Sequence, residues 1–295
     1  MEGLVLPQLF NGLSVASLYL LAALGLALSF GLMRVINMAH GEMLMLGGYL
    51  AFLTLSLVPG TGGILLAVPV AFVGAALMGA LIQLTLVRRL LARPLDTLIA
   101  TWGVSLILQQ AARDLFGAVG VEVRAPDWLA GSVQLGSMAF PTARLFILLA
   151  TLLVLGALAL LFRTTRAGLH IRAVNQDRAM AAMLGINVGR VELMMFALGT
   201  GIAGLAGVML ALLGPVTPTV GQSYIVPAFL VVVLGGVGSI QGTTIAALML
   251  GLVSAVAQIF VDVSVAQLLL LLFVILFLQV RPQGVITTSS RALDG

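Results

Sequence analysis

Polar side chains follow one side of an otherwise apolar stretch at residues 97–112. Trp102, Ser105 and Gln109 are spaced i, i+3 and i+7, and Thr101 precedes Ser105 by one helical turn, so a helix would align them in one stripe. Hydroxyl and amide groups can bind a neutral polar solute without burying an ion. The stripe predicts the lining of a substrate pathway, while hydrogen bonding between neighbouring helices is an equally good interpretation.

Asn37, His40 and Glu42 stand in a break between two apolar stretches, at residues 36–42. An ionisable group in a membrane span is costly unless it is paired, which makes it a candidate for function. The break lies near the predicted inner end of a span, beside Arg34, and this favours a structural ion pair or a helix cap over contact with substrate. We assign the three residues a structural or gating role. Two ligands two residues apart do not make a metal site.

A second break contains Gly235, Gly236 and Gly238. Each break precedes a span rich in Leu and Gly, and paired breaks in two halves of a chain are typical of transporters. The pattern predicts a weak internal repeat, with two ordinary loops as the alternative. The three glycines are grouped as structural or gating residues, because glycine can form a hinge or expose its backbone to a cavity; tight packing explains them equally well.

The elements that position these residues are apolar stretches of membrane-spanning character. Of the 295 residues, 61% are hydrophobic and 8% are charged, and the mean hydropathy is +1.21, which indicates an integral membrane protein. We predict an all-α polytopic bundle, one transmembrane domain over residues 1–295, with eight or nine spans. The apolar stretches fall at 12–33, 43–58, 63–87, 97–112, 144–162, 191–213, 226–236, 243–261 and 265–280. The stretch at 226–236 is too short to cross, so it is a broken or re-entrant helix or part of a longer one.

All fourteen basic residues are arginines, and their placement predicts the orientation of the chain. Basic residues in short loops stay on the cytoplasmic side. The arginines at 88–93 and throughout 163–190 therefore place these loops inside, with 117–142 and 214–224 outside. The N-terminus is then outside and the C-terminus cytoplasmic.

Composition also excludes several functions. Without lysine the chain has no GxxxxGK[ST] phosphate loop, and without cysteine it has no thiolate chemistry. The arginines lie between apolar runs and form no patch with aromatic residues, so nucleic-acid binding is excluded. We expect no enzymatic activity and no cofactor on this chain.

The loop at 163–190 encodes a short helix at about residues 176–184. Asn175 is the predicted N-cap, Asp177 lies in the first turn, and Gly185 fits a C-terminal stop. Met180, Met183 and Leu184 share one face by i, i+3, i+4 spacing, with Arg178 elsewhere, so the helix presents an apolar ridge suited to a groove in a partner. Packing of this helix on its own bundle is the alternative.

Residues 172–187, from Arg172 to Asn187, resemble the cytoplasmic coupling segment of ABC importer permeases of the branched-chain amino acid and amide family. Residues 36–42, 235–242 and 281–284 also resemble that family's motifs, and together they extend the resemblance over nearly the whole chain. Residues 37–42 and 101–110 look more like its urea permease branch than its amino acid branch.

The resemblance implies several partners: a second homologous permease, two cytoplasmic ATPases that carry ATP and Mg²⁺, and a periplasmic or extracellular substrate-binding protein, in a bacterial inner membrane. It implies contact with the ATPases by the coupling segment: Arg172, Asn175, Asp177, Arg178, Met180, Met183, Leu184 and Gly185. We expect the cargo to be urea or a short amide, whose carbonyl and N–H groups suit the polar stripe.

Two alternatives remain for the function. One is the same importer carrying branched-chain amino acids. A zwitterionic cargo would require a countercharge in mid-membrane, and the acidic residues map near span ends, so the sequence favours a neutral cargo. A stand-alone urea channel or carrier is less favoured, because a carrier usually places a carboxylate in mid-span.

Overall fold

The computed structural model describes residues 2–135 and 138–286, and most of them are helical. Within these residues each of the nine predicted apolar stretches corresponds to a long helix. These are α1 (Glu2–Met33), α2 (His40–Leu57), α3 (Thr61–Ile82), α5 (Pro94–Phe116), α7 (Thr142–Thr164), α10 (Val188–Ala211), α11 (Val220–Gly235), α12 (Ile240–Phe260) and α13 (Val263–Val280). The prediction of an all-α polytopic bundle is confirmed.

Short elements connect the long helices. A π-helical turn η1 (Gln83–Val87) and α4 (Arg88–Leu90) extend α3. Between α5 and α7 lie α6 (Asp127–Ala130) and a hairpin of β1 (Ser132–Leu135) and β2 (Met138–Pro141), in which Ser132 is opposite Pro141. Between α7 and α10 lie α8 (Arg166–Gln176) and α9 (Arg178–Met183).

The number of crossings remains a prediction. Six helical segments within the described residues are long and apolar enough to span a membrane: Pro7–Met33, Thr61–Leu90, Thr142–Thr164, Val188–Ala211, Ile240–Phe260 and Val263–Val280. α2 and α5 carry ionisable residues such as Glu42 and Asp96. α11 starts at Val220, so the short stretch at 226–236 is part of a longer helix that begins in the preceding loop. Its 16 residues still measure only about 24 Å.

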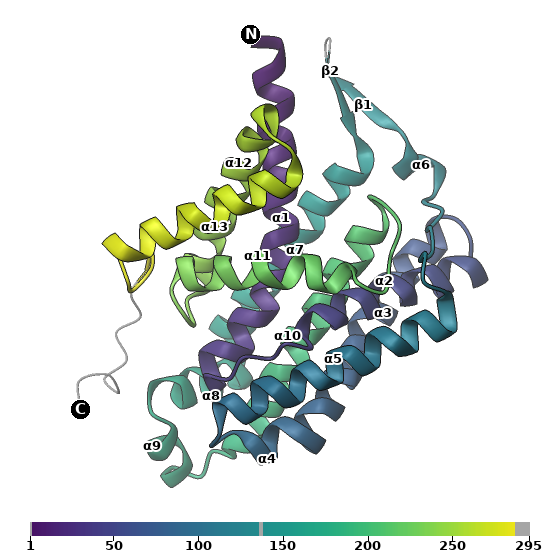
Figure 1. The fold of residues 1–295 in the computed structure, drawn as a ribbon. Helices are drawn as coiled ribbons and strands as arrows, with labels where there is room; N and C mark the ends of the chain where they lie inside the picture. Colours follow the sequence, from purple (N-terminus) through teal and green to yellow (C-terminus); the bar gives the residue numbers. More distant parts are fainter. Residues whose placement is uncertain (1, 136–137, 287–295) are drawn as a thin grey trace.

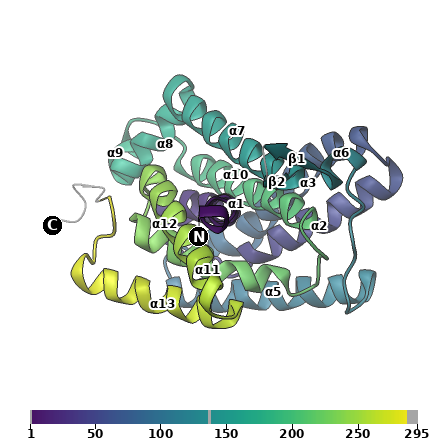
Figure 2. The same ribbon diagram turned by 90° about the horizontal axis from the view of Figure 1, so that it is seen from above.

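α1 lies at the centre of the bundle. Figure 2 shows it close to end-on, with α7 along one margin and α5 and α13 along the other. α1 packs against α10, α11 and α12, and α10 packs in turn against α2 and α3. α11 and α13 cross α1 obliquely (Figure 1), so the bundle is not a set of parallel rods.

Glycines allow backbones to touch where the central helices cross. A Cβ on Gly25 of α1 would lie 2.1 Å from the carbonyl oxygen of Gly199 in α10, and one on Gly47 of α2 would lie 2.0 Å from that of Gly204. Both distances are far below van der Waals contact, so no larger residue fits. Such crossings are typical of membrane helices, which gain packing where small residues let them approach.

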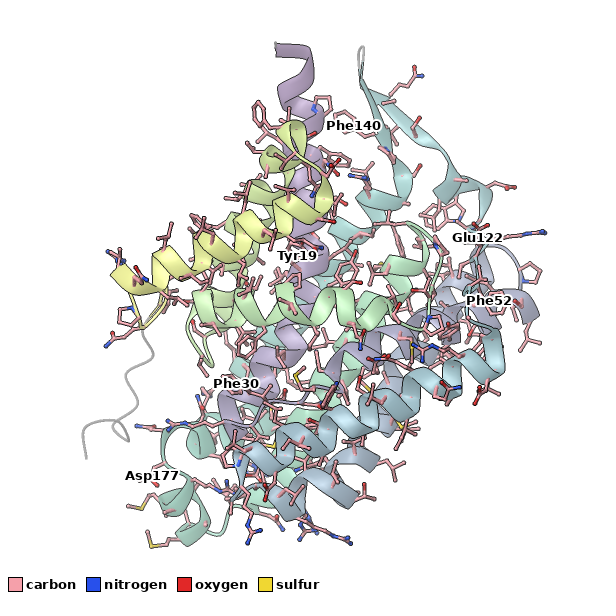
Figure 3. All side chains as sticks on the ribbon, viewed as in Figure 1. Tyr19, Phe30, Phe52, Glu122, Phe140 and Asp177 are labelled. Atoms are coloured by element: carbon pink, nitrogen blue, oxygen red, sulfur yellow. The ribbon has the colours of Figure 1, made fainter. Side chains whose placement is uncertain are left out.

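The predicted outer and inner loops lie at opposite ends of the molecule. Figure 3 shows Phe140, in the hairpin, at one end and Asp177, beside α9, at the other. Phe140 packs edge-on against Phe10 of α1, with ring centroids 4.9 Å apart, so the hairpin is fixed to the start of α1. Which end faces the cytoplasm remains a prediction, and the C-terminus itself lies outside the described residues.

Candidate functional site

α5 turns its polar side toward the bundle and its apolar side outward. Thr97, Thr101, Ser105 and Gln109 repeat every fourth residue, and each is at most 3% exposed. Leu106 and other large apolar residues of α5 are exposed. The buried side is packed against α2, and we call this contact the α2–α5 seam.

Glu42 of α2 is the centre of the seam. The Ser105 hydroxyl and the Gln109 side-chain amide both donate to Glu42 Oε1, each at 2.8 Å. The Gln109 amide also lies 3.1 Å from the Ser105 hydroxyl oxygen. Glu42 is 1% exposed, and no hydrogen-bond donor among the described residues reaches its second carboxylate oxygen, Oε2.

Contacts on either side of Glu42 show that α2 and α5 run in the same direction along the seam. At the start of α2 the backbone N–H of Met38 donates to the Thr101 hydroxyl oxygen at 3.1 Å. Farther along, the ring of Tyr49 stacks on Phe116 with centroids 4.2 Å apart. Three of the four predicted pathway residues, Thr101, Ser105 and Gln109, thus lie together in the seam.

Trp102, the fourth predicted pathway residue, lies elsewhere. Its side chain is 52% exposed, on the outward side of α5. The spacing i, i+3, i+7 is compatible with a common stripe, but the i, i+4 repeat of Thr101, Ser105 and Gln109 is the one that faces α2. Trp102, one residue after Thr101, is rotated about 100° away from that repeat. The prediction of one stripe that includes Trp102 was therefore wrong.

His40 and Glu42 lie in the first turn of α2, at the end of a helix as predicted, but this end is inside the bundle. His40 Nε2 donates to the carbonyl oxygen of Ala22 at 3.1 Å. Ala22 lies eleven residues before the end of α1 at Met33, about 16 Å along the helix and about half the thickness of a hydrocarbon core. Ser105 is likewise the middle residue of α5, eleven residues from either end. Glu42 therefore lies in the middle of the bundle, not near its inner end.

Neither predicted local role of Glu42 is found in the described residues. The two ion pairs there join other residues, so Glu42 forms none with Arg34. The N-cap of α2 is Ala39, which has no side chain to cap with, and Asn37 Oδ1 accepts from the Ala39 backbone N–H at 3.1 Å. Asn37 thus orders the turn that leads into α2.

A close backbone contact allows α2 to begin in mid-bundle. A Cβ on Gly41 would lie 2.5 Å from the carbonyl oxygen of Gly221, in the first turn of α11. The starts of α2 and α11 therefore meet at this point. Apolar stretches alone did not predict the contact; Gly41, next to an ionisable residue at a break, was the available signal.

Gly235, Gly236 and Gly238 lie at the turn between α11 and α12. Gly236 has φ 95° and Gly238 φ 81°, a backbone conformation that favours glycine. A Cβ on Gly31 of α1 would be 2.6 Å from the Cα of Gly238, and one on Gly235 would be 2.5 Å from the carbonyl carbon of Gly242. Tight packing and turn geometry both account for these residues, while a hinge role remains a prediction.

α9 is the predicted short helix, with a different cap. Asp177 is extended and its Oδ1 accepts from the backbone N–H of Met180 at 2.9 Å, whereas Asn175 lies in the last turn of α8. The prediction of Asn175 as the N-cap was wrong, because the chain continues α8 through Asn175 and breaks only at Asp177. Gly185 has φ 85°, and the N–H groups of Gly185 and Ile186 donate to Ala182 and Ala181, so the predicted C-terminal stop is present.

The apolar ridge on α9 is exposed as predicted. Met180, Met183 and Leu184 are 50%, 73% and 74% exposed, while Ala181 beside them is buried. An ion pair of 2.7 Å joins Arg178 to the buried Glu192 of α10, so α9 is attached to a central helix of the bundle. Arg172, the other predicted coupling arginine, lies on α8 and is exposed.

The chain is similar to permease proteins over nearly its whole length. The family described as "Branched-chain amino acid transport system / permease component" matches residues 8–279. The high-affinity branched-chain amino acid transport system permease protein LivH of Salmonella typhimurium is 32% identical over 293 residues, 95% of each chain. The corresponding protein BraD of Pseudomonas aeruginosa is 32% identical over 298 residues, again 95% of each chain. No solved structure matches.

A more distant relative carries a different cargo. The ribose import permease protein RbsC of Escherichia coli is 28% identical over 267 residues, 83% of this chain and 75% of the relative. All of these relatives are named as transport permeases, not as enzymes. The match over residues 8–279 and the 32% identity over 95% of each chain lead to one conclusion: the chain is a multi-pass membrane protein that belongs to the family of permease components of branched-chain amino acid transport systems.

Proposed function

We propose that this chain is the membrane-spanning subunit of an ATP-binding-cassette importer that moves branched-chain amino acids into the cell. One observation carries the proposal: relatives named for branched-chain amino acid transport match 95% of the chain at 32% identity. Urea or a short amide, the cargo that the polar stripe suggested, has no support in these comparisons, and the alternative fits better.

The exposed ridge of α9 supports a docking role toward cytoplasmic ATPases. A short helix capped at both ends is stiff, and its ion pair with α10 links it to the centre of the bundle. ATP and Mg²⁺ would be bound by the ATPases, and their closure would push on Met180, Met183 and Leu184. Closure of the ATPases would thereby move α10 and the helices packed on it as rigid bodies.

The remaining parts of the proposal follow from the same arrangement. The hairpin end would face the outside and receive substrate from a binding protein, and the α9 end would face the cytoplasm. A second permease would complete the pathway in a bacterial inner membrane. The α2–α5 seam, with Thr101, Ser105 and Gln109, is the polar surface that we propose lines it.

Uptake by whole cells tests the cargo. Cells that lack their own branched-chain amino acid importers would express this chain with its ATPases, second permease and binding protein, and receive labelled leucine, urea or ribose in separate assays. We expect leucine uptake at least tenfold above that of cells without the chain, and no gain for urea or ribose. A gain for urea without one for leucine would overturn the proposed cargo.

A further inference from the structure

The carboxylate of Glu42 has an unused oxygen in the middle of the bundle. Ser105 and Gln109 both donate to Oε1, and nothing in the described part of the chain donates to Oε2. Glu42 is 1% exposed, and neither ion pair of the described residues includes it. A buried carboxylate without an ion-pair partner is destabilising. Arg113, one turn beyond Gln109 on α5, attracts it through its charge but forms no ion pair or hydrogen bond with it, so Oε2 still lacks a donor within the described residues.

Holding α5 against α2 does not require a carboxylate. The hydroxyl of Ser105 and the amide of Gln109 need only an acceptor oxygen, and the side-chain carbonyl of a glutamine would offer one at the same place. What the carboxylate adds is acidity and a negative charge. A cationic group that enters the seam would interact with this negative charge.

The proposed cargo carries such a group. An amino acid crosses as a zwitterion, and in the middle of a membrane its ammonium group requires a countercharge. Resting on the function proposed above, we propose that Glu42 binds the α-ammonium group of the amino acid as it crosses the middle of the membrane.

The seam is suited to opening for this purpose. Around Glu42 the buried side of α5 contacts α2 through polar groups, and the apolar contact across the seam lies farther along, where Phe116 stacks on Tyr49. Separating α5 from α2 near Glu42 therefore exchanges a few hydrogen bonds for contacts with a polar substrate. The Glu42 side chain becomes accessible when α5 moves outward.

Glu42→Gln in the complete importer tests the proposal, because it keeps the shape and the acceptor oxygen but removes the charge. Leucine uptake would be measured as kcat/KM at equal amounts of assembled complex. We expect a loss of at least tenfold. Asp114→Asn, the same change at an exposed position of α5, is the matched control and should stay within twofold of wild type.

Uptake by Glu42→Gln within twofold of wild type would overturn the inference while leaving the proposed function intact. A wild-type importer that takes up no leucine would instead overturn the proposed function. Ser105→Ala removes one hydrogen bond to Glu42 but keeps the charge of Glu42, so kcat/KM for leucine uptake should fall less than threefold. A fall as large as that of Glu42→Gln would show that Glu42 has a structural role only.

A second measurement covers the case in which Glu42→Gln fails to assemble. The wild-type complex in membranes would be treated with a membrane-permeant carbodiimide, and modification of Glu42 would be measured by mass spectrometry. We expect leucine-loaded binding protein with ATP to lower modification at least twofold relative to leucine-free binding protein with ATP. Equal modification under both conditions, including none at all, would overturn the inference.

Discussion

The buried polar residues of α5 gather around one carboxylate, that of Glu42 in α2. Three buried polar residues of α5, Thr101, Ser105 and Gln109, form hydrogen bonds with α2 or the turn before it, and Ser105 and Gln109 both donate to the Glu42 carboxylate. In a medium without water each of these groups needs a protein partner.

Gln109→Leu should destabilise the permease. The change removes one of the two donors to Glu42 Oε1 and leaves a buried carboxylate less satisfied, which costs about 1–3 kcal/mol. The loss would be measured as a lower midpoint of thermal unfolding of the purified complex. Gln110→Leu is the control, because Gln110 is exposed and its side-chain bonds, to Asp114 and Arg113, are exposed as well. Equal midpoints of thermal unfolding for the two variants would contradict a stabilising role of the Gln109–Glu42 hydrogen bond.

Residue spacing predicted part of the seam but not its centre. The i, i+4 relation of Thr101 and Ser105 shows in the sequence, and the structure brings both to α2. Trp102 was grouped with them because i, i+3 spacing also places residues on one side of a helix. The partner of the stripe, Glu42, was not predicted, because sequence spacing within one helix carries no information about which helix lies opposite.

At the scale of elements, α9 is a rigid projection from the bundle. Asp177 caps its start, Gly185 ends it, and the Arg178–Glu192 ion pair fixes it to α10. Capping residues are recognisable in sequence, so the helix itself was predicted. The exact cap was not, because Asn175 and Asp177 are both good caps and only the length of α8 decides between them.

Met183→Asp should abolish ATP-dependent leucine uptake while the permease still inserts. A carboxylate on the exposed ridge would have to be desolvated in the groove of an ATPase, which weakens docking. Uptake and co-purification of the ATPase would both be measured. Ala182→Asp, on a different side of the same helix, is the control and should retain both. Normal uptake by Met183→Asp would show that the ridge does not couple the ATPases to transport.

Gly47→Val should prevent the central helices from packing. The new side chain would overlap the carbonyl oxygen of Gly204, which lies 2.0 Å from the position of a Cβ, and α2 would have to move away from α10. The yield of folded permease in membranes, measured as protease-resistant protein, should fall at least fivefold. Gly156→Val is the matched control, since no atom lies within 4 Å of its Cβ position. Equal yields would show that the crossing tolerates a larger residue.

At the scale of the whole molecule, hydropathy predicted the helices well and their arrangement poorly. Every predicted apolar stretch is helical, because a backbone in lipid must satisfy its own hydrogen bonds. The predicted outer loop at 117–142 contains a hairpin of two short strands, which hydropathy does not indicate because neither strand is a long apolar stretch. Hydropathy also gives the length of a segment and not its neighbours, so it did not predict that the start of α2 packs against α11.

The two ends of the molecule should face opposite sides of the membrane. The chain has no cysteine, so single cysteines can be introduced and labelled without background. In intact cells a membrane-impermeant maleimide should label Ser132→Cys, in the hairpin, but not Met183→Cys, on α9. In inside-out vesicles the pattern should reverse. Labelling of Met183→Cys in intact cells would contradict the predicted orientation and place α9 out of reach of cytoplasmic ATPases.

Transport by the purified complex tests the central claim most directly. The complete importer would be reconstituted in proteoliposomes with ATP on the side of the α9 end and leucine-loaded binding protein on the other side. We predict that labelled leucine accumulates only with ATP, and that a complex with a catalytically inactive ATPase accumulates none. Leucine accumulation by the inactive complex, or none by the active one, would contradict the account of this chain as an ATP-driven amino acid permease.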